Sequence, residues 1–113
     1  VMDGDRDNGF GPSPMEMLLL GIGGCSSIDV VHILKKGREN VLDVETDVKA
    51  ERAETDPKVF TKIHLHFKVK GENLNETKVG RAVELSAEKY CSASIMLARA
   101  GVNMTHTHEV REV

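Results

Sequence analysis

The feature that most constrains the fold is a helix start at Ser13 that opens a long apolar run. Ser13 can cap the helix, Pro14 suits the first helical position, and Glu16 can complete a capping box. The helix is expected to end at Lys36, before Gly37, where basic residues complement the negative end of the helix dipole. Its first half is apolar on nearly every face, so protein must surround most of it. We therefore expect this helix to be the central helix of the fold.

Three glycines lie in the apolar half of this helix, at positions 21, 23 and 24. Each costs roughly 1 kcal/mol relative to alanine in a helix interior. Their presence predicts either a close approach of another backbone or a local bend. Because Cys25 follows directly, we expect it at a crowded junction.

Two alternating segments follow the helix. Residues 41–50 and 59–69 alternate apolar and polar side chains, which is typical of strands with one solvated face. Residues 55–57, Thr-Asp-Pro, supply the turn between them. The two segments are expected to form an antiparallel pair.

The remainder predicts two more helices and a last strand. A helix from Asn75 to about Tyr90 and a short helix over residues 92–100, closed by Gly101, precede a weakly alternating strand over residues 102–113. Residues 1–11 indicate a strand end that runs into a loop. We expect one α+β domain over residues 1–113, because a chain this short encloses a single core.

The composition argues against several functions. The net charge is −3 and the basic residues are scattered, so nucleic acid is a poor partner. The most apolar stretch, residues 17–25, is far shorter than a bilayer span, and no leader-like segment precedes it. We expect a cytoplasmic protein with no membrane contact.

The two cysteines are the candidate reactive groups. Cys25 is followed by the first polar residues of the apolar helix, among them Asp29. Cys91 opens the short third helix, where free backbone amides and the helix dipole lower the pKa of a thiol. The alternative is that both are small buried hydrophobic residues. Position alone leaves both interpretations open.

Two stretches, GPSPMEMLLLGIGGCSSIDVVHILKKGR and SAEKYCSASIML, together resemble the superfamily of OsmC and organic hydroperoxide resistance (Ohr) proteins, in particular its YhfA-like branch. The resemblance runs from Gly11 to the C-terminus. It implies an OsmC-like α+β fold in which a long central helix packs against antiparallel sheets of an intertwined homodimer. The N-terminal strands of the family are expected to be short or absent here.

The resemblance also implies a thiol-dependent peroxidase for organic or fatty-acid hydroperoxides. Cys25 would attack the peroxide and become a sulfenic acid, and Cys91 would trap it as a disulfide. A dithiol reductant of the lipoyl type or similar would reset the pair. This chemistry requires no cofactor and no metal. The alternative is a non-catalytic stress-response or small-ligand-binding protein with the same fold.

In this family an Arg and a Glu stabilise the reactive thiolate. Glu16 is the matching acid, but it lies nine positions before Cys25 and points away from it in a straight helix. It would act across a bend or from the partner subunit, and its other role is the capping box. Arg6 lies in the N-terminal loop and is no clear match for the Arg.

Other polar and apolar residues flank the two thiols. Asp29 lies one turn after Cys25, where its charge would raise the thiol pKa, or it could be a buried acceptor. His32, two turns away, is too distant to form a nucleophile pair with Cys25. Tyr90 and Met96 are candidates to bind substrate, although packing is the simpler role for both.

The histidines suggest a rival metal site. His64 and His66, and likewise His106 and His108, are spaced to share one face of a strand. Four imidazoles could converge if the two strands were neighbours. A solvated strand face is the alternative, because lysines flank the first pair.

Overall fold

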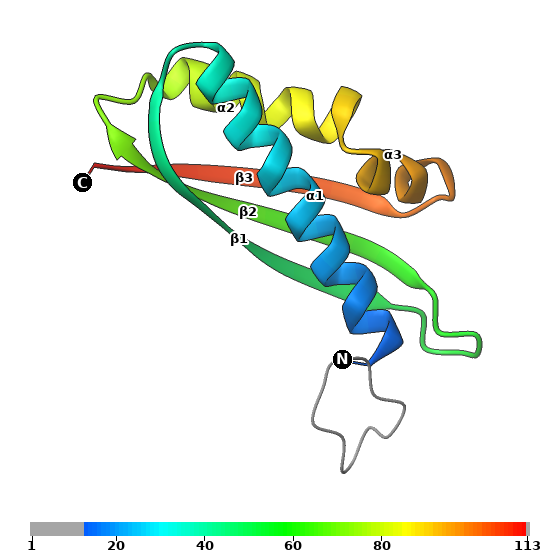
Figure 1. Ribbon diagram of the computed structural model, residues 1–113. Coiled ribbons are helices and arrows are strands. Elements are labelled where there is room, and N and C mark those ends of the chain that lie inside the picture. The colour runs from blue at the N-terminus through cyan, green and yellow to red at the C-terminus, as the bar shows by residue number, and fades with distance from the viewer. Residues whose placement is uncertain (1–12, 113) are drawn as a thin grey trace.

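The computed structural model describes residues 13–112 as a three-stranded sheet with helices packed on one face (Figure 1). The expected N-terminal loop, with Arg6, lies outside the described residues. The elements in chain order are α1 (Pro14–Lys36), β1 (Asn40–Arg52), β2 (Phe60–Glu72), α2 (Glu76–Leu85), the π-helical turn η1 (Ser86–Tyr90), α3 (Ser92–Arg99) and β3 (Asn103–Glu112).

The start and end of α1 are those that the sequence predicts. The Glu16 backbone N–H donates to Ser13 Oγ at 3.2 Å, and the Ser13 N–H donates to the Glu16 carboxylate at 3.4 Å. Pro14 occupies the first turn, and the helix ends at the Gly37 cap. The capping box therefore satisfies two of the amides that a helix start leaves unpaired.

One face of α1 packs closely on the sheet. Ile22, Val30 and Leu34 are almost fully buried on that face. A Cβ on Gly23 would lie 3.0 Å from Val48 Cγ2 of β1, so glycine allows the helix to approach this strand. The close contact at this glycine is with a side chain and not with the predicted second backbone, and a Cβ at Gly21 would meet nothing within 4 Å.

The opposite face of α1 is apolar but exposed. Over its most apolar 18 residues α1 has a mean hydropathy of 1.8, with 28% of that window buried, so by length and composition it could cross a membrane. Core helices of globular domains meet the same test. We interpret α1 as a core helix because its packed face covers the sheet (Figure 1).

The sheet has the order β1-β2-β3. β1 and β2 are antiparallel, as predicted, with Thr46 opposite Phe67. β3 pairs with β2 in parallel, so the expectation of antiparallel sheets alone is wrong. The connection from β2 to β3 passes through α2, η1 and α3, and such a crossover can return the chain to the end where β2 began.

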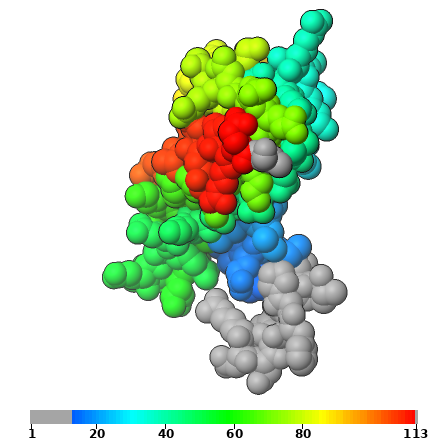
Figure 2. All heavy atoms as spheres, turned by 90° about the vertical axis from the view of Figure 1, so that its left-hand side faces the viewer, coloured from blue at the N-terminus to red at the C-terminus, as the bar shows by residue number. Residues whose placement is uncertain are grey.

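The core lies between the sheet and the helices. In the space-filling view, the C-terminal part of β3, in red, lies between α2 and the other strands (Figure 2). Much of this core comes from side chains of β2 and α2 that, like Val30 and Leu34 of α1, have an exposed fraction of 1% or less: Ile63, Leu65, Phe67, Val69, Val79 and Val83. Their alternation along β2 is the one that the sequence predicts.

The second predicted helix changes its geometry before its end. After Leu85 the backbone widens into a π-helical turn, closed by the Cys91 N–H on the Ser86 carbonyl at 2.7 Å. Bonds of this i→i+5 type alter the spacing of side chains around the axis. Tyr90, at the end of this turn, is 54% exposed, so the expectation that it packs in the core is wrong.

Phe67→Ala should lower the free energy of unfolding by about 3–5 kcal/mol, because it opens a cavity beneath the helices. Urea denaturation followed by circular dichroism would measure the change. Val59→Ala is the control, since Val59 is 54% exposed and should change stability by at most about 0.5 kcal/mol. Equal effects of the two substitutions would contradict this placement of the core.

Candidate active site

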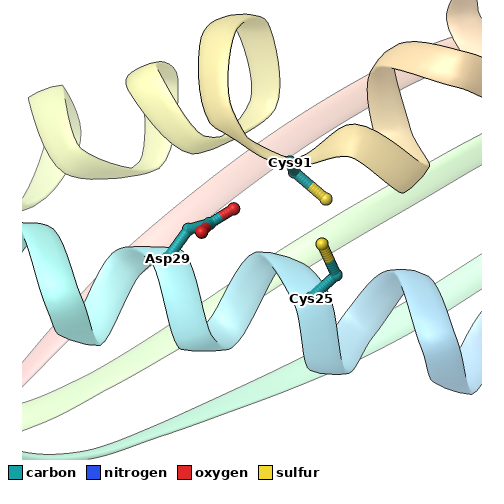
Figure 3. A group of neighbouring side chains, drawn as sticks. All are labelled: Cys25, Asp29 and Cys91. Atoms are coloured by element: carbon teal, nitrogen blue, oxygen red, sulfur yellow. The ribbon is translucent and has the colours of Figure 1, made fainter.

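Cys25 and Cys91 face each other across the contact between α1 and the start of α3 (Figure 3). Both thiols are free. Their sulfur atoms and a carboxylate oxygen of Asp29 all lie within 4.8 Å of one another. Two sulfurs this near can form a disulfide after modest movement of the side chains. The structure thus brings together the two cysteines that the sequence singles out.

The π-helical turn and α3 position Cys91. Its backbone is extended, with φ −76° and ψ 98°, so it is the N-cap residue of α3. η1 ends immediately before it, and both η1 and α3 contact α1. The change from η1 to α3 therefore directs the Cys91 side chain toward α1.

Cys91 is fully buried, and hydroxyl groups surround its sulfur. Ser26 Oγ donates to Cys91 Sγ at 3.2 Å and lies 3.5 Å from Ser94 Oγ. Burial alone would raise the pKa of Cys91, but the Ser26 and Ser94 hydroxyls and the Ser94 backbone N–H lower it. The result is a Cys91 pKa below the ordinary thiol value.

Cys25 is half-buried, and its pKa shifts in the opposite direction. Burial raises the pKa of Cys25, and the neighbouring Cys91 sulfur and the Asp29 charge raise it further. The Ala93 backbone N–H, in the first turn of α3, acts against this rise. The predicted effect of Asp29 on the thiol is confirmed. The more acidic thiol is thus Cys91, whereas the more accessible one is Cys25.

Asp29 lies one turn beyond Cys25 and joins the thiols from the same helix (Figure 3). Its Oδ2 atom is buried and has no hydrogen-bond partner among the described residues. Burial raises the pKa of Asp29, and the nearby His32 partly offsets the rise. The expectation that Asp29 accepts a bond from a buried donor is wrong for this oxygen.

Glu16 does not reach the thiols within one chain. It lies in the capping box at the start of α1, and α1 is helical without interruption from there to Cys25. Nine residues of α-helix separate the two by about 13 Å along the axis. No bend in α1 brings the predicted acid to the site, so only a partner subunit could do so.

The two predicted substrate-binding residues lie on the surface near Cys91. Tyr90 is 54% exposed and Met96 is 62% exposed. A hollow of about 420 Å³ adjoins the cluster at Ser94, and neither cysteine lines it. The hollow therefore does not open onto either thiol.

The prediction of a four-histidine metal site is wrong, because the register between β2 and β3 separates the two histidine pairs. His64 is opposite Thr105, whereas His106 is opposite Leu65, so the two pairs lie on different faces of the sheet. His64 Nδ1 lies 2.6 Å from Thr105 Oγ1, and His66 Nε2 lies 3.0 Å from the Glu109 carboxylate. These bonds already use the ring nitrogens of the outer face.

Ser26 and Ser94 are site residues that sequence reasoning missed. Ser26 follows Cys25 but points to the buried side of α1, where Ser86 Oγ donates to its carbonyl oxygen at 3.3 Å. Ser94 is the third residue of α3, whose N-cap is Cys91. Capping geometry could have indicated Ser94, because amides at that position commonly face the N-cap side chain.

The chain belongs to the OsmC-like protein family, which matches residues 4–107. Protein YhfA of Escherichia coli (strain K12) is 54% identical over 110 residues, which cover 97% of this chain and 81% of YhfA. The predicted family is confirmed.

Solved structures show the same fold. A hypothetical protein from Aquifex aeolicus VF5 superposes with a TM-score of 0.85 at 38% identity, over 94% of this chain and 79% of that one. An organic hydroperoxide resistance protein OsmC from Legionella pneumophila superposes with a TM-score of 0.73 at 21% identity, over 91% and 73% of the two chains. The second likeness shows the fold alone.

Ser26→Ala should raise the pKa of Cys91, because it removes a hydroxyl that donates to the thiolate. Ultraviolet absorbance of the thiolate, followed across pH in a Cys25→Ser background, would show the Cys91 midpoint move to higher pH. Ser27→Ala is the matched control, since Ser27 Oγ donates to the Gly23 carbonyl oxygen instead. An unchanged midpoint in Ser26→Ala would contradict the assigned bond.

Proposed function

We propose that this OsmC-like protein is a thiol-dependent peroxidase that reduces organic and fatty-acid hydroperoxides through Cys25 and Cys91. The observation that carries the proposal is the pair of free, facing thiols within 4.8 Å of each other. The family includes organic hydroperoxide resistance proteins, such as OhrB of Bacillus subtilis. The pKa shifts and the burial of the two thiols give each a separate role.

In the first step the accessible thiol attacks the peroxide. The Cys25 sulfur forms a bond to one peroxide oxygen, the O–O bond breaks, and the alkoxide leaves. The thiol proton passes through the neighbouring Cys91 sulfur to the alkoxide, which departs as an alcohol. Cys25 is oxidised to a sulfenic acid and the peroxide is reduced.

In the second step the buried thiol resolves the intermediate. Cys91, whose lowered pKa favours the thiolate, attacks the sulfenic sulfur of Cys25, and the hydroxyl group takes a proton from solvent and leaves as water as the disulfide forms. Full burial protects Cys91 itself from peroxide. A dithiol reductant of the lipoyl type or similar would then attack the more exposed Cys25 sulfur. The cycle suits the cytoplasm, where thiol reductants are abundant.

Cys25→Ser should abolish steady-state reduction of cumene hydroperoxide in the presence of dihydrolipoamide, because it removes the attacking sulfur. Cys91→Ser should consume one equivalent of peroxide and stop as a sulfenic acid. Mass spectrometry after dimedone trapping would detect that acid on Cys25. Normal turnover in Cys25→Ser, or no sulfenic acid in Cys91→Ser, would refute the assignment.

One group of observations favours a second candidate, a non-catalytic stress-response or small-ligand-binding protein. Asp29 and burial raise the pKa of Cys25, and no cation is among the leading influences on that thiol from the described residues. Glu16 also lies far from the thiols. Stopped-flow measurement separates the candidates, since a rate with peroxide no faster than that of free cysteine favours the second.

We also propose that the protein is a homodimer whose interface covers the exposed face of α1. Several apolar or small residues share this face at helical spacing, and Leu20 and Ile28 are 60% and 70% exposed. An apolar patch of this kind is typical of protein interfaces. The stripe consists of Met17, Leu20, Gly21, Gly24 and Ile28. In such a dimer the partner subunit's Glu16 could approach the thiols.

Ile28→Glu should shift the protein from dimer to monomer, because it buries an unpaired carboxylate in the proposed interface. Sedimentation equilibrium of the full chain would measure the mass. Val59→Glu, at another exposed apolar position in the β1–β2 connection, is the control and should remain dimeric. A monomeric wild-type protein would overturn the dimer proposal.

A further inference from the structure

We propose that Cys25, Cys91 and Asp29 form a binding site for Zn²⁺ when both cysteines are reduced. The two sulfurs and the carboxylate oxygen lie within 4.8 Å of one another and converge from α1 and the start of α3 (Figure 3). Tetrahedral zinc with typical bond lengths holds such donor atoms roughly 3.5–3.8 Å apart. The cluster therefore needs to contract by only about 1 Å around the ion.

The unpaired oxygen of Asp29 favours the binding of a cation by this cluster. Asp29 Oδ2 is buried without a hydrogen-bond partner among residues 13–112. Asp29 also makes no salt bridge with any basic side chain of that part of the chain. A buried carboxylate oxygen without a partner is costly, so a bound cation would supply the missing interaction.

The chemistry of the donors selects the metal. Two thiolates and one carboxylate carry three negative charges, one more than is needed to neutralise a divalent ion. Sulfur donors favour zinc over magnesium or calcium, which prefer oxygen. Zinc binding would release the thiol protons, and in this way it overcomes the raised pKa of Cys25.

Hydrogen-bond donors surround the Cys91 sulfur, as they commonly surround the ligands of a metal ion. Ser26 Oγ donates to Cys91 Sγ at 3.2 Å, and the Ser94 hydroxyl and backbone N–H also stabilise the thiolate. Groups of this kind orient metal ligands and tune their basicity. Cys25 is only half-buried, so the ion has a path of entry and water can take the fourth coordination position.

Zinc binding and disulfide formation exclude each other at this site. A Cys25–Cys91 disulfide forms when the two thiolates give two electrons to an oxidant, and this consumes both sulfur ligands. Oxidation by diamide, which is reduced to its hydrazine, should therefore release the ion. This inference does not depend on peroxidase activity, because binding and release can be measured without peroxide.

The test is a titration of the reduced, metal-free full chain with ZnCl₂, measured by isothermal titration calorimetry. One ion per chain is expected, and CoCl₂ should give a sulfur-to-cobalt charge-transfer band with the strong visible bands of a tetrahedral site. Cys25→Ser and Cys91→Ser should lose that band. Asp29→Asn should weaken zinc binding by about 100-fold or more, since loss of a ligand should exceed the 10–100-fold cost of losing a second-shell partner.

A control separates this site from the histidines of the sheet. The double variant His64→Ala/His66→Ala should bind zinc as the wild type does. Circular dichroism would confirm that each variant is folded. Wild-type affinity in Asp29→Asn or Cys25→Ser, or loss of binding in the histidine variant, would overturn the proposal, as would zinc that stays bound after diamide oxidation.

Discussion

The buried hydrogen bond from Ser26 to the Cys91 sulfur is the interaction on which the site depends. It joins α1 to the start of α3, two elements that are far apart in the sequence. Because Ser26 is adjacent to Cys25, the same bond sets the distance between the two thiols. It also supplies the donor that opposes the desolvation of Cys91. Close packing of α1 on the sheet, which Gly23 allows, holds Ser26 in this buried position.

The site divides accessibility and acidity between two sulfurs. Cys91 has the donors that stabilise a thiolate but is closed to solvent, and Cys25 is open but lies beside a carboxylate. Neither thiol alone has the properties of a fast nucleophile, which needs both an ionised sulfur and access. In the proposed peroxidase cycle the pair would therefore act as a unit, in which a proton moves between the two sulfurs.

Local signals in the sequence predict much of this fold, and contacts between distant segments account for the rest. The capping box and the alternation of β1 and β2 are local, so the bounds of α1 and the first strand pair follow from the residues. The π-helical turn, the parallel pairing of β3 and the separation of the histidine pairs depend on the crossover and its register. The role of Ser26 depends on the contact between α1 and α3, which no short sequence pattern predicts, whereas capping geometry within α3 could have indicated Ser94.

Asp29 has opposite effects on the two chemistries that this site supports. Its charge raises the pKa of Cys25, which slows attack on a peroxide, and the same charge attracts a cation to the sulfurs. A bound cation would in turn reverse the effect of Asp29 and favour the thiolates, but it would also occupy the sulfur lone pairs that attack requires. Zinc and peroxide would thus compete for Cys25. Under this view the buried, unpaired oxygen of Asp29 couples the redox state of the thiol pair to the occupancy of a metal site.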